Sequence, residues 1–442
     1  MKEIFKKTPF LKVIAFFAIL VVLIVCCTKV LLYRDRKTDN SSYQIINFYK
    51  EEKDSAEVVF IGSSNCFSFY SPLFAYNSYG IKTTNFSSSG MGMIAFKYAI
   101  EEVNKTQENA HIVITITPMD EMSYSALHYL ADYMPMSMNK LNLLKAYFSR
   151  GDESILNSAE YFFPLMRFHE RWSELTLDDL ILDDGTKGAT SHEYYLTYSN
   201  DVNEYFYSSE EKKEMPDNWK ELMSELLDYC DENERDVTFL FPPRSYEEDE
   251  YKELNSLIDY ISSRNYEVLD LREKYDEIGL DLSYDFYDKR HTNVHGSFKY
   301  TDYVIRKIMD KYNIVSKEKN DVSFNKAFDA YYEKIKPYVL DIELDIDKRD
   351  FFLGRPESLS ATYSDDSVSL KWDEVKNADG YAVYRKTDTE WKLIGETQEK
   401  SFTDNEPLKG INTYTVISYR DDSGNRKFGN YNYKGIEVEV DR

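Results

Sequence analysis

The spacing of hydrophobic positions changes along the chain and divides it into regions. Short apolar runs rich in β-branched residues predict buried strands at 58–61, 112–116, 237–241 and 268–271. Ahead of the third run, apolar residues recur at helical spacing and predict an amphipathic helix over 217–232. Because strands and helices alternate, we expect a parallel sheet with helices on both faces, in an α/β domain over residues 41–345.

Two stretches depart from this pattern. Residues 121–215 are rich in Tyr, Met and Phe, and they predict a largely helical insertion that caps a site. After a linker at 346–355, apolar and polar residues alternate around Trp372 and again around Val416, with turn signals between them. This alternation predicts a small antiparallel β-sandwich over residues 356–442.

The N-terminal segment is apolar enough to enter a membrane. From Val13 to Cys27 the chain runs fifteen residues without a polar interruption, and its flanks extend the stretch to about 25, enough to cross a ~30 Å hydrocarbon core. A cleaved signal peptide is the alternative, because basic residues precede the run. No small-x-small cleavage site follows Cys27, so we expect residues 1–40 to form an uncleaved anchor with its flanks. Four Lys or Arg lie on each side, so charge alone does not set the topology.

Composition and charge narrow the classes of function. Hydrophobic residues make up 42% of the 442 residues and aromatic residues 15%, which excludes global disorder and fits two or three domains. The net charge of the chain is −24. Residues 1–37 carry eight basic against two acidic side chains, so the net charge of the remaining residues is more negative than −24. Such a body repels phosphate backbones, and we expect no nucleic-acid partner. We expect no disulfide framework from four cysteines, two of them in the apolar N-terminal segment.

A serine pair follows the first predicted strand. Gly62, Ser63 and Ser64 come directly after this strand, and Ser71-Pro72 opens a predicted helix. In an open α/β sheet, ligands bind outside the carboxyl ends of the strands. A hydroxyl at this place is exposed and close to unpaired backbone N–H donors, which favours a nucleophilic serine. A tight polar turn accounts for the same residues without chemistry.

A carboxylate and an imidazole lie three residues apart before another predicted helix. Asp288 and His291 precede an amphipathic pattern over 297–312, and their spacing lets the carboxylate reach the ring across one helical turn or a tight loop. A hydrogen bond to Nδ1–H fixes the tautomer and leaves Nε2 free as a base. Two alternatives stay open: an ordinary surface loop, or a metal site made by His291 and His295 with Asp288.

The two stretches together resemble the SGNH/GDSL hydrolase family, whose first block carries a nucleophilic serine and whose last block reads Asp-x-x-His. The resemblance implies a three-layer SGNH-like fold and a catalytic triad of Ser64, His291 and Asp288, without a metal or a cofactor. Ser63 is the alternative nucleophile. Residues 85–90 match the second family block, in which a glycine after a strand supplies an N–H to the oxyanion hole, so the resemblance implies that the N–H of Gly90 joins that of Ser64 there.

Two features are more similar to a membrane-anchored branch of this family. They are the Gly62-Ser63-Ser64 variant and the His-x-Asn-x-x-Gly pattern at 291–296. The branch includes the D-alanyl-transfer protein of teichoic acids and polysaccharide O-acetylation proteins. The resemblance implies an esterase or O-acyltransferase outside the cytoplasmic membrane, which acts on an acyl donor and an envelope glycan. A membrane-bound O-acyltransferase is the implied partner that hands over the acyl group.

The C-terminal alternation resembles a fibronectin type III domain. The resemblance rests on the strand that ends in Trp372, the strand at 380–385 and the residues Tyr414-Thr415-Val416. It implies a spacer or adhesion module that carries no chemistry of its own.

One departure from the family keeps a second function open. The third family block places an Asn side chain in the oxyanion hole, whereas residues 114–120 read Ile-Thr-Ile-Thr-Pro-Met-Asp. Loss of one such donor costs about 10²–10³ in turnover. The anchored branch often departs in the same way, so activity is compatible with this sequence. The alternative is a catalytically degenerate envelope scaffold that binds glycan or a membrane acyltransferase.

Overall fold

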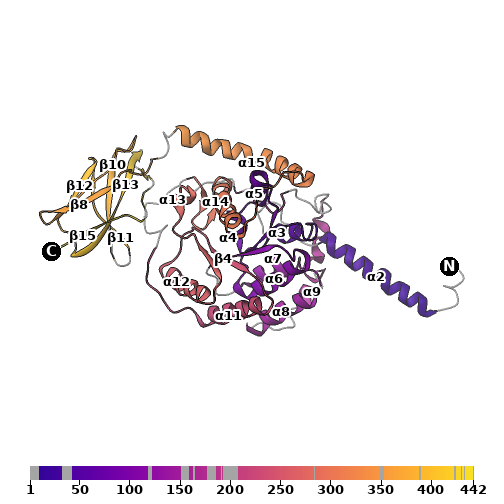
Figure 1. Cartoon of the computed structure of the whole chain (residues 1–442). Helices are drawn as coiled ribbons and strands as arrows, with labels where there is room; N and C mark the ends of the chain where they lie inside the picture. The colour runs from indigo at the N-terminus through magenta and orange to yellow at the C-terminus, as the bar shows by residue number, and fades with distance from the viewer. Residues whose placement is uncertain are drawn as a thin grey trace.

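The fold is described from a computed structural model of the whole chain. The structure describes residues 9–31, 42–117, 122–150, 159–162, 165–176, 186–190, 192, 208–282, 284–348, 353–387, 390–422, 425–429, 431–432 and 434–441. Its centre is a parallel sheet, and two antiparallel sheets follow at the C-terminal end (Figure 1).

The central sheet has five parallel strands in the order β2-β1-β3-β4-β5. They are β1 (Val58–Gly62), β2 (Thr83–Ser87), β3 (His111–Thr115), β4 (Val237–Phe241) and β5 (Glu267–Asp270). The four strands predicted from apolar runs lie within one residue of their predicted limits. Only β2 was not predicted as an apolar run, because its sequence Thr-Thr-Asn-Phe-Ser is mostly polar although every residue is buried.

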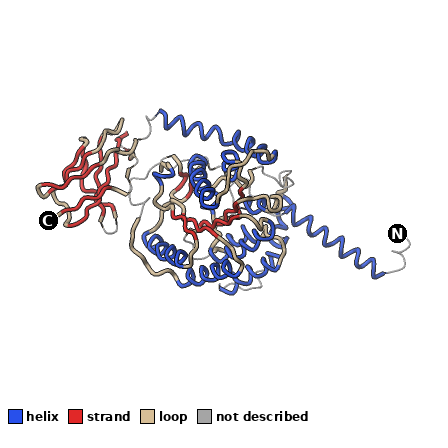
Figure 2. Tube along the Cα trace, viewed as in Figure 1, coloured by secondary structure: helices blue, strands red, loops and turns tan. Residues whose placement is uncertain are grey.

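Helices cover both faces of this sheet (Figure 2). Val59 and Ile61 of β1 pack into the core under α6 (Met93–Thr106), α11 (Asp217–Glu232) and α12 (Glu248–Ser263). Val58 and Phe60 point the other way, into the core under α4 (Ser64–Phe69) and α14 (Val294–Tyr312). This alternation is the two-residue period of a strand buried on both faces. Helix α11 matches its predicted limits, and α14 begins three residues before the predicted start.

The predicted insertion at 121–215 is helical over much of its described part. It contains α7 (Tyr124–Ala131), α8 (Met138–Arg150), α9 (Ala159–Phe162), α10 (Leu165–Phe168) and the 3₁₀ helix η2 (His169–Ser173). Helix α8 packs on α6, while α10 and η2 contact α2 (Pro9–Leu31). The insertion therefore lies on the side of the sheet from which the N-terminal helix projects (Figure 1).

A long helix continues past the predicted domain boundary. Helix α15 (Val322–Lys348) packs Phe324, Tyr331 and Ile335 against α5 (Pro72–Tyr79), so it belongs to the α/β body. It runs three residues beyond position 345 and into the predicted linker. Burial continues toward its end, where Ile342 is 1% exposed, so the helical pattern does not stop at the predicted boundary.

The C-terminal region forms two antiparallel sheets around a shared core. One sheet contains β8 (Ser360–Ser364), β9 (Ser367–Lys371) and β12 (Ser401–Asp404). The other contains β10 (Gly380–Lys386), β11 (Trp391–Thr397), β13 (Gly410–Asp422), β14 (Asn425–Phe428) and β15 (Ile436–Val440). Buried residues of both sheets, among them Leu370, Val383 and Val416, pack together. The predicted alternation of buried and exposed positions is therefore present.

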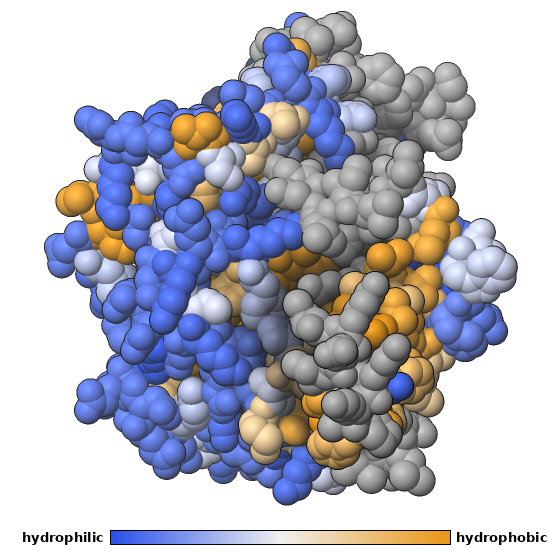
Figure 3. Space-filling view, turned by 90° about the vertical axis from the view of Figure 1, so that its right-hand side faces the viewer, coloured by the Kyte–Doolittle hydropathy of each residue, from blue (hydrophilic) through white to orange (hydrophobic). Residues whose placement is uncertain are grey.

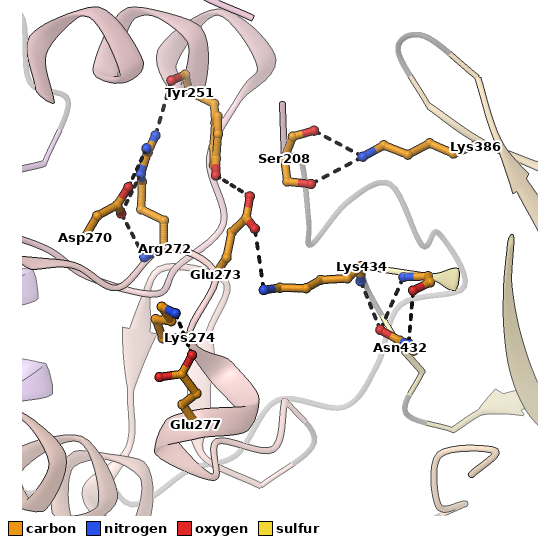
Figure 4. Close-up of polar contacts among 11 residues, drawn as sticks. Ser208, Tyr251, Asp270, Arg272, Glu273, Lys274, Glu277, Lys386, Asn432 and Lys434 are labelled. Carbon is orange, nitrogen blue, oxygen red and sulfur yellow. Dashed lines mark hydrogen bonds and ion pairs between the residues drawn. The ribbon is translucent and has the colours of Figure 1, made fainter. Parts of the chain in front are cut away.

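The C-terminal sheets are docked on the α/β body. Trp391 and Tyr419 share one buried cluster with Tyr275 of α13 (Tyr275–Ile278). Polar contacts surround this cluster: Lys386 donates to the carbonyl and hydroxyl oxygens of Ser208, and Lys434 lies 3.7 Å from Glu273 (Figure 4). In the predicted linker, Arg355 pairs with Asp276 at 2.9 Å. These contacts fix the second module on the segment that follows β5.

Helix α2 projects from the body (Figure 1). Residues Phe10–Thr28 are long and apolar enough to cross a membrane, and none of this stretch is buried inside the protein. The 23 residues of α2 extend over roughly 34 Å at 1.5 Å per residue. The same length and composition also fit a signal sequence near the N-terminus.

Gly62 provides a test of the close packing at the end of β1. A Cβ at this position would lie 2.9 Å from Cβ of Cys66 and 3.0 Å from the carbonyl oxygen of Thr115, whereas Gly354 has no neighbour nearer than 4.0 Å. We expect Gly62→Ala to lower the free energy of unfolding by roughly 1–3 kcal/mol, measured by urea denaturation of the full chain. The control Gly354→Ala should be nearly neutral. Equal stability of the two variants would contradict the packing described here.

Candidate active site

Ser64 lies where a parallel sheet of this order binds ligands. The chain passes from β1 to β2 on one side and later places β3 on the other side of β1. The crevice at such a reversal, outside the carboxyl ends of the strands, is the usual ligand site of open α/β sheets. Ser64 is separated from β1 by Ser63 alone and is the first residue of α4.

The structure brings Ser64 and His291 together from 227 positions apart. The Oγ atom of Ser64 lies 2.8 Å from Nε2 of His291, within the predicted hydrogen-bond reach. On the other side of the ring, Nδ1 lies 3.0 and 2.9 Å from the two carboxylate oxygens of Asp288. A hydroxyl, an imidazole and a carboxylate therefore form one hydrogen-bonded chain, the arrangement that activates a serine nucleophile in acyl-transfer enzymes.

The carboxylate and the imidazole are held in a tight hairpin. Strand β6 (Phe286–Asp288) pairs with β7 (His291–Thr292), and Asp288 is opposite His291 in the register. The sequence allowed the three-residue spacing to be either a helical turn or a tight loop, and the structure shows the tight loop. The hairpin is tied to α4, because Thr292 Oγ1 donates to the carbonyl of Ser68 and Asn65 Nδ2 to that of Arg290.

The surroundings of Asp288 favour its ionised form. Burial alone raises the pKa of this carboxyl, but the hydrogen bond and charge of His291 oppose that effect, as do the backbone N–H groups of Arg290 and His291. The net result is a pKa below the ordinary value of Asp. The carboxylate is therefore present to accept from Nδ1–H and to stabilise an imidazolium when His291 takes a proton.

The last part of the motif anchors the hairpin to α14. Asn293 caps this helix, since its side-chain oxygen accepts from the N–H of Gly296 at 3.0 Å. Gly296 lies so close to Asp285 that a Cβ would meet the Asp285 carbonyl oxygen at 2.2 Å. The Asn and Gly of the His-x-Asn-x-x-Gly pattern thus have structural reasons, and neither touches Ser64.

The two serines of the turn have different environments. Ser63 is 2% exposed, and its hydroxyl lies 3.1 Å from Oγ1 of Thr117. Ser64 is partly exposed and contacts the imidazole. The geometry therefore favours Ser64 over the alternative nucleophile Ser63.

His295 does not join His291. Its Nδ1 lies 2.5 Å from Oδ1 of Asp285, a fully buried carboxylate that also accepts from Lys299. Over the described ranges, no group of three or more His, Cys, Asp or Glu side chains is placed to hold a metal ion. The alternative in which His291, His295 and Asp288 share a metal is therefore not supported by their positions.

Gly90 lies in the turn after β2, next to the strand that carries Ser64. The Gly62–Ser87 register places the ends of β1 and β2 side by side, and the N–H of Ser88 donates to the carbonyl of Gly62 at 3.2 Å. Gly90 has φ = 70°, a left-handed conformation that favours glycine. Its assignment to the oxyanion hole stays a prediction, as do the catalytic roles of Ser64, His291 and Asp288.

The third block is described only in part. Thr117 follows β3 and is buried with its hydroxyl on Ser63, as noted above, while positions 118–120 lie outside the described residues. A Thr hydroxyl therefore occupies this end of the β3 segment and fixes the turn before Ser64. The sequence contains no signal that pairs Thr117 with Ser63.

An aromatic stack beside His291 was also not predicted from the sequence. The ring of Tyr287 stacks on His291 with centroids 5.3 Å apart, and His192 stacks on the same tyrosine at 4.1 Å. The N–H of Val294 donates to the carbonyl of His192. One residue of the insertion thus lies beside the tyrosine that stacks on His291, while the capping role of the insertion stays a prediction. No pattern around His192 points to this contact, because it depends on two segments about 95 residues apart.

Comparisons with known proteins give a limited result. No protein-family model matches the chain, and no curated protein matches it. Weak structural neighbours are fibronectin type III-like proteins. "Structure of FN3tt mut" is 20% identical, with 20% of this chain and 98% of that chain covered and a TM-score of 0.18. "Crystal Structure of FN3tt" is 18% identical, with 21% and 99% covered and a TM-score of 0.18. A Fn3-like protein from Clostridium thermocellum is 19% identical, with 18% and 85% covered and a TM-score of 0.15.

Ser64 and Ser63 form a matched pair for a test of the nucleophile. We expect the full chain to be labelled by a fluorophosphonate probe, Ser64→Ala to abolish labelling, and Ser63→Ala to retain most of it, because only Ser64 contacts His291. Labelling is measured by gel fluorescence, and a thermal melt checks that each variant is folded. Undiminished labelling of folded Ser64→Ala would exclude Ser64 as the nucleophile.

The role of Asp288 has its own expected signature. Asp288→Asn should lower the labelling rate by about 10⁴-fold, as loss of the carboxylate does in serine proteases. Since the pKa of Asp288 lies below the ordinary value of Asp, its carboxylate stays ionised at every pH above that ordinary value, so labelling lost there reports on another group. The exposed Asp310 of α14 gives the control Asp310→Asn, which should label like the unaltered protein. Equal rates for Asp288→Asn and the control would remove Asp288 from the relay.

Proposed function

We propose that this protein is a membrane-anchored serine esterase or O-acyltransferase that acts on a cell-envelope polysaccharide. The observation that supports this proposal most strongly is the hydrogen-bonded chain from Ser64 through His291 to Asp288 at the carboxyl edge of the sheet. The five-stranded parallel sheet with helices on both faces is consistent with the three-layer fold of the SGNH family.

In the proposed first step, Ser64 attacks the carbonyl carbon of an acyl donor. The hydroxyl proton moves to Nε2 of His291 as the new C–O bond forms, and Asp288 stabilises the resulting imidazolium through Nδ1–H. Negative charge develops on the former carbonyl oxygen. The backbone N–H groups of Ser64 and Gly90 are the proposed donors to this oxygen.

In the second half, the tetrahedral intermediate collapses to an acyl ester on Ser64. The C–O bond to the leaving group breaks, and the imidazolium returns its proton to the departing oxygen. Water or a sugar hydroxyl then attacks the ester with His291 again as base, which releases a free acid or an acylated glycan. No cofactor is needed for either outcome.

Several features support a site of action at the cell envelope. Helix α2 is long and apolar enough to act as a membrane anchor. The rest of the chain is strongly acidic, which suits a glycan substrate better than a nucleic acid. The body is proposed to lie outside the cytoplasmic membrane, with a membrane-bound O-acyltransferase as the source of the acyl group. The fibronectin-like module is proposed to be a fixed support, because its sheets are docked on the body.

The proposal is tested by trapping the acyl ester. We expect the full chain in detergent micelles to give a burst of one p-nitrophenol per protein with p-nitrophenyl acetate, followed by slow turnover. Mass spectrometry should find the acetyl group on the peptide that contains Ser64. The control Ser63→Ala should retain the burst, and Ser64→Ala should lose it.

Hydrolysis and transfer are separated by adding an envelope polysaccharide as acceptor. Faster decay of the acyl-enzyme with acetyl groups on the glycan indicates transfer, whereas unchanged decay with free acetate indicates hydrolysis. A folded protein that forms no acyl ester with the ester or with the fluorophosphonate would favour the scaffold, to which the absent Asn of the third block also points.

A further inference from the structure

We propose that α10 and η2, residues 165–173, form a second membrane contact that lies on the bilayer surface beside α2. In this arrangement Trp172 and Met166 enter the boundary between lipid headgroups and acyl chains. The inference rests on α2 spanning the membrane, as in the proposed function, and it adds a surface and its partner, a lipid bilayer.

The segment is joined to the end of α2. Elements α10 and η2 both contact this helix, and Nη1 of Arg171 donates to the carbonyl oxygen of Leu31 at 2.9 Å. Leu31 is the last residue of α2, where carbonyl groups have no partner within the helix. Arg171 therefore satisfies one of them and fixes η2 at the point where α2 meets the body.

The position of this joint along α2 corresponds to the membrane interface. The stretch that is apolar enough to cross a bilayer ends at Thr28, three residues before Leu31. At 1.5 Å per residue, the joint lies roughly 4–5 Å beyond the end of the apolar span. Headgroups occupy this depth, and Trp is enriched there because its ring is apolar and its N–H is polar.

The side chains of the segment are arranged for an apolar neighbour outside the protein. Arg167 points toward Asp132 of the body at 3.7 Å, and Phe168 is buried. Met166 and Trp172, by contrast, are 60% and 73% exposed. Arg167 and Glu170 are exposed as well, so apolar and charged side chains share this surface, as in an amphipathic element that lies among lipid headgroups. The pattern therefore fits a helix that lies in the interface plane.

Trp172 is exceptional among the four tryptophans of the chain. Trp219, Trp372 and Trp391 are at most 5% exposed, so each is packed in a core. Figure 3 views the molecule from the side on which α2 projects, and hydrophobic surface gathers toward the centre and right of that face. Lipid is favoured as the occupant over a protein partner, because α10 and η2 contact a helix whose residues Phe10–Thr28 are long and apolar enough to cross a bilayer.

The test measures the depth of Trp172 in a bilayer. The full chain is inserted into nanodiscs of phosphatidylcholine and phosphatidylglycerol, with or without bromine on the acyl chains, and tryptophan emission is recorded. The difference between the unaltered protein and Trp172→Phe isolates the emission of Trp172. We expect this difference signal to be blue-shifted and at least halved by the brominated lipid, while the three buried tryptophans of Trp172→Phe are unaffected.

Two outcomes would overturn the inference. In the first, the difference signal is unquenched by brominated lipid and readily quenched by acrylamide. This result would show that Trp172 faces water and is open to a protein partner instead of lipid. In the second, the full chain fails to enter nanodiscs, which would remove the anchor itself. The second outcome would also remove the membrane anchor from the proposed function, whereas the first would not. Neither outcome bears on the acyl ester of Ser64, and Ser64→Ala should leave the quenching unchanged, so failure of the lipid contact and failure of the proposed chemistry are distinguishable.

Discussion

One hydrogen bond, between Oγ of Ser64 and Nε2 of His291, joins the two halves of the candidate site. The two residues are 227 positions apart, and neither has chemistry of this kind alone. A central parallel strand fixes the serine, because β1 is paired on both sides and ends at the turn that carries it. The histidine is fixed by a two-strand hairpin that is tied to α4 through Thr292 and Asn65.

The electrostatic state of the site follows from this packing. A partly buried carboxylate is costly unless hydrogen-bond donors surround it, and Asp288 has two backbone N–H groups and the imidazole of His291. The donors more than offset its burial, so the pKa is lowered. A second carboxylate, Asp285, is fully buried just before β6 and pairs with His295 and Lys299 of α14. The chain from Asp285 to His295 thus holds two Asp–His pairs, and the pair of Asp288 and His291 is the one that reaches Ser64.

Much of the fold could be predicted from the sequence where periodicity is strong. The four apolar strands and α11 lie within one residue of their predicted limits, because burial on both faces or on one helical stripe leaves a clear pattern. Strand β2 lacked that pattern: Thr83 and Asn85 are buried polar residues that bond to Tyr70. The candidate site was predicted from the spacing of its motifs. The contact between the hydroxyls of Ser63 and Thr117 could not be predicted in this way, because it depends on β3 lying next to β1 in the sheet.

The structure of a covalently inhibited protein tests the central claim most directly. A crystal structure after reaction with a fluorophosphonate should show phosphorus bonded to Oγ of Ser64, with Nε2 of His291 within hydrogen-bond distance of that oxygen. The phosphoryl oxygen should point toward the backbone N–H groups of Ser64 and Gly90. An adduct on another residue, or a phosphoryl oxygen turned away from both N–H groups, would contradict the account.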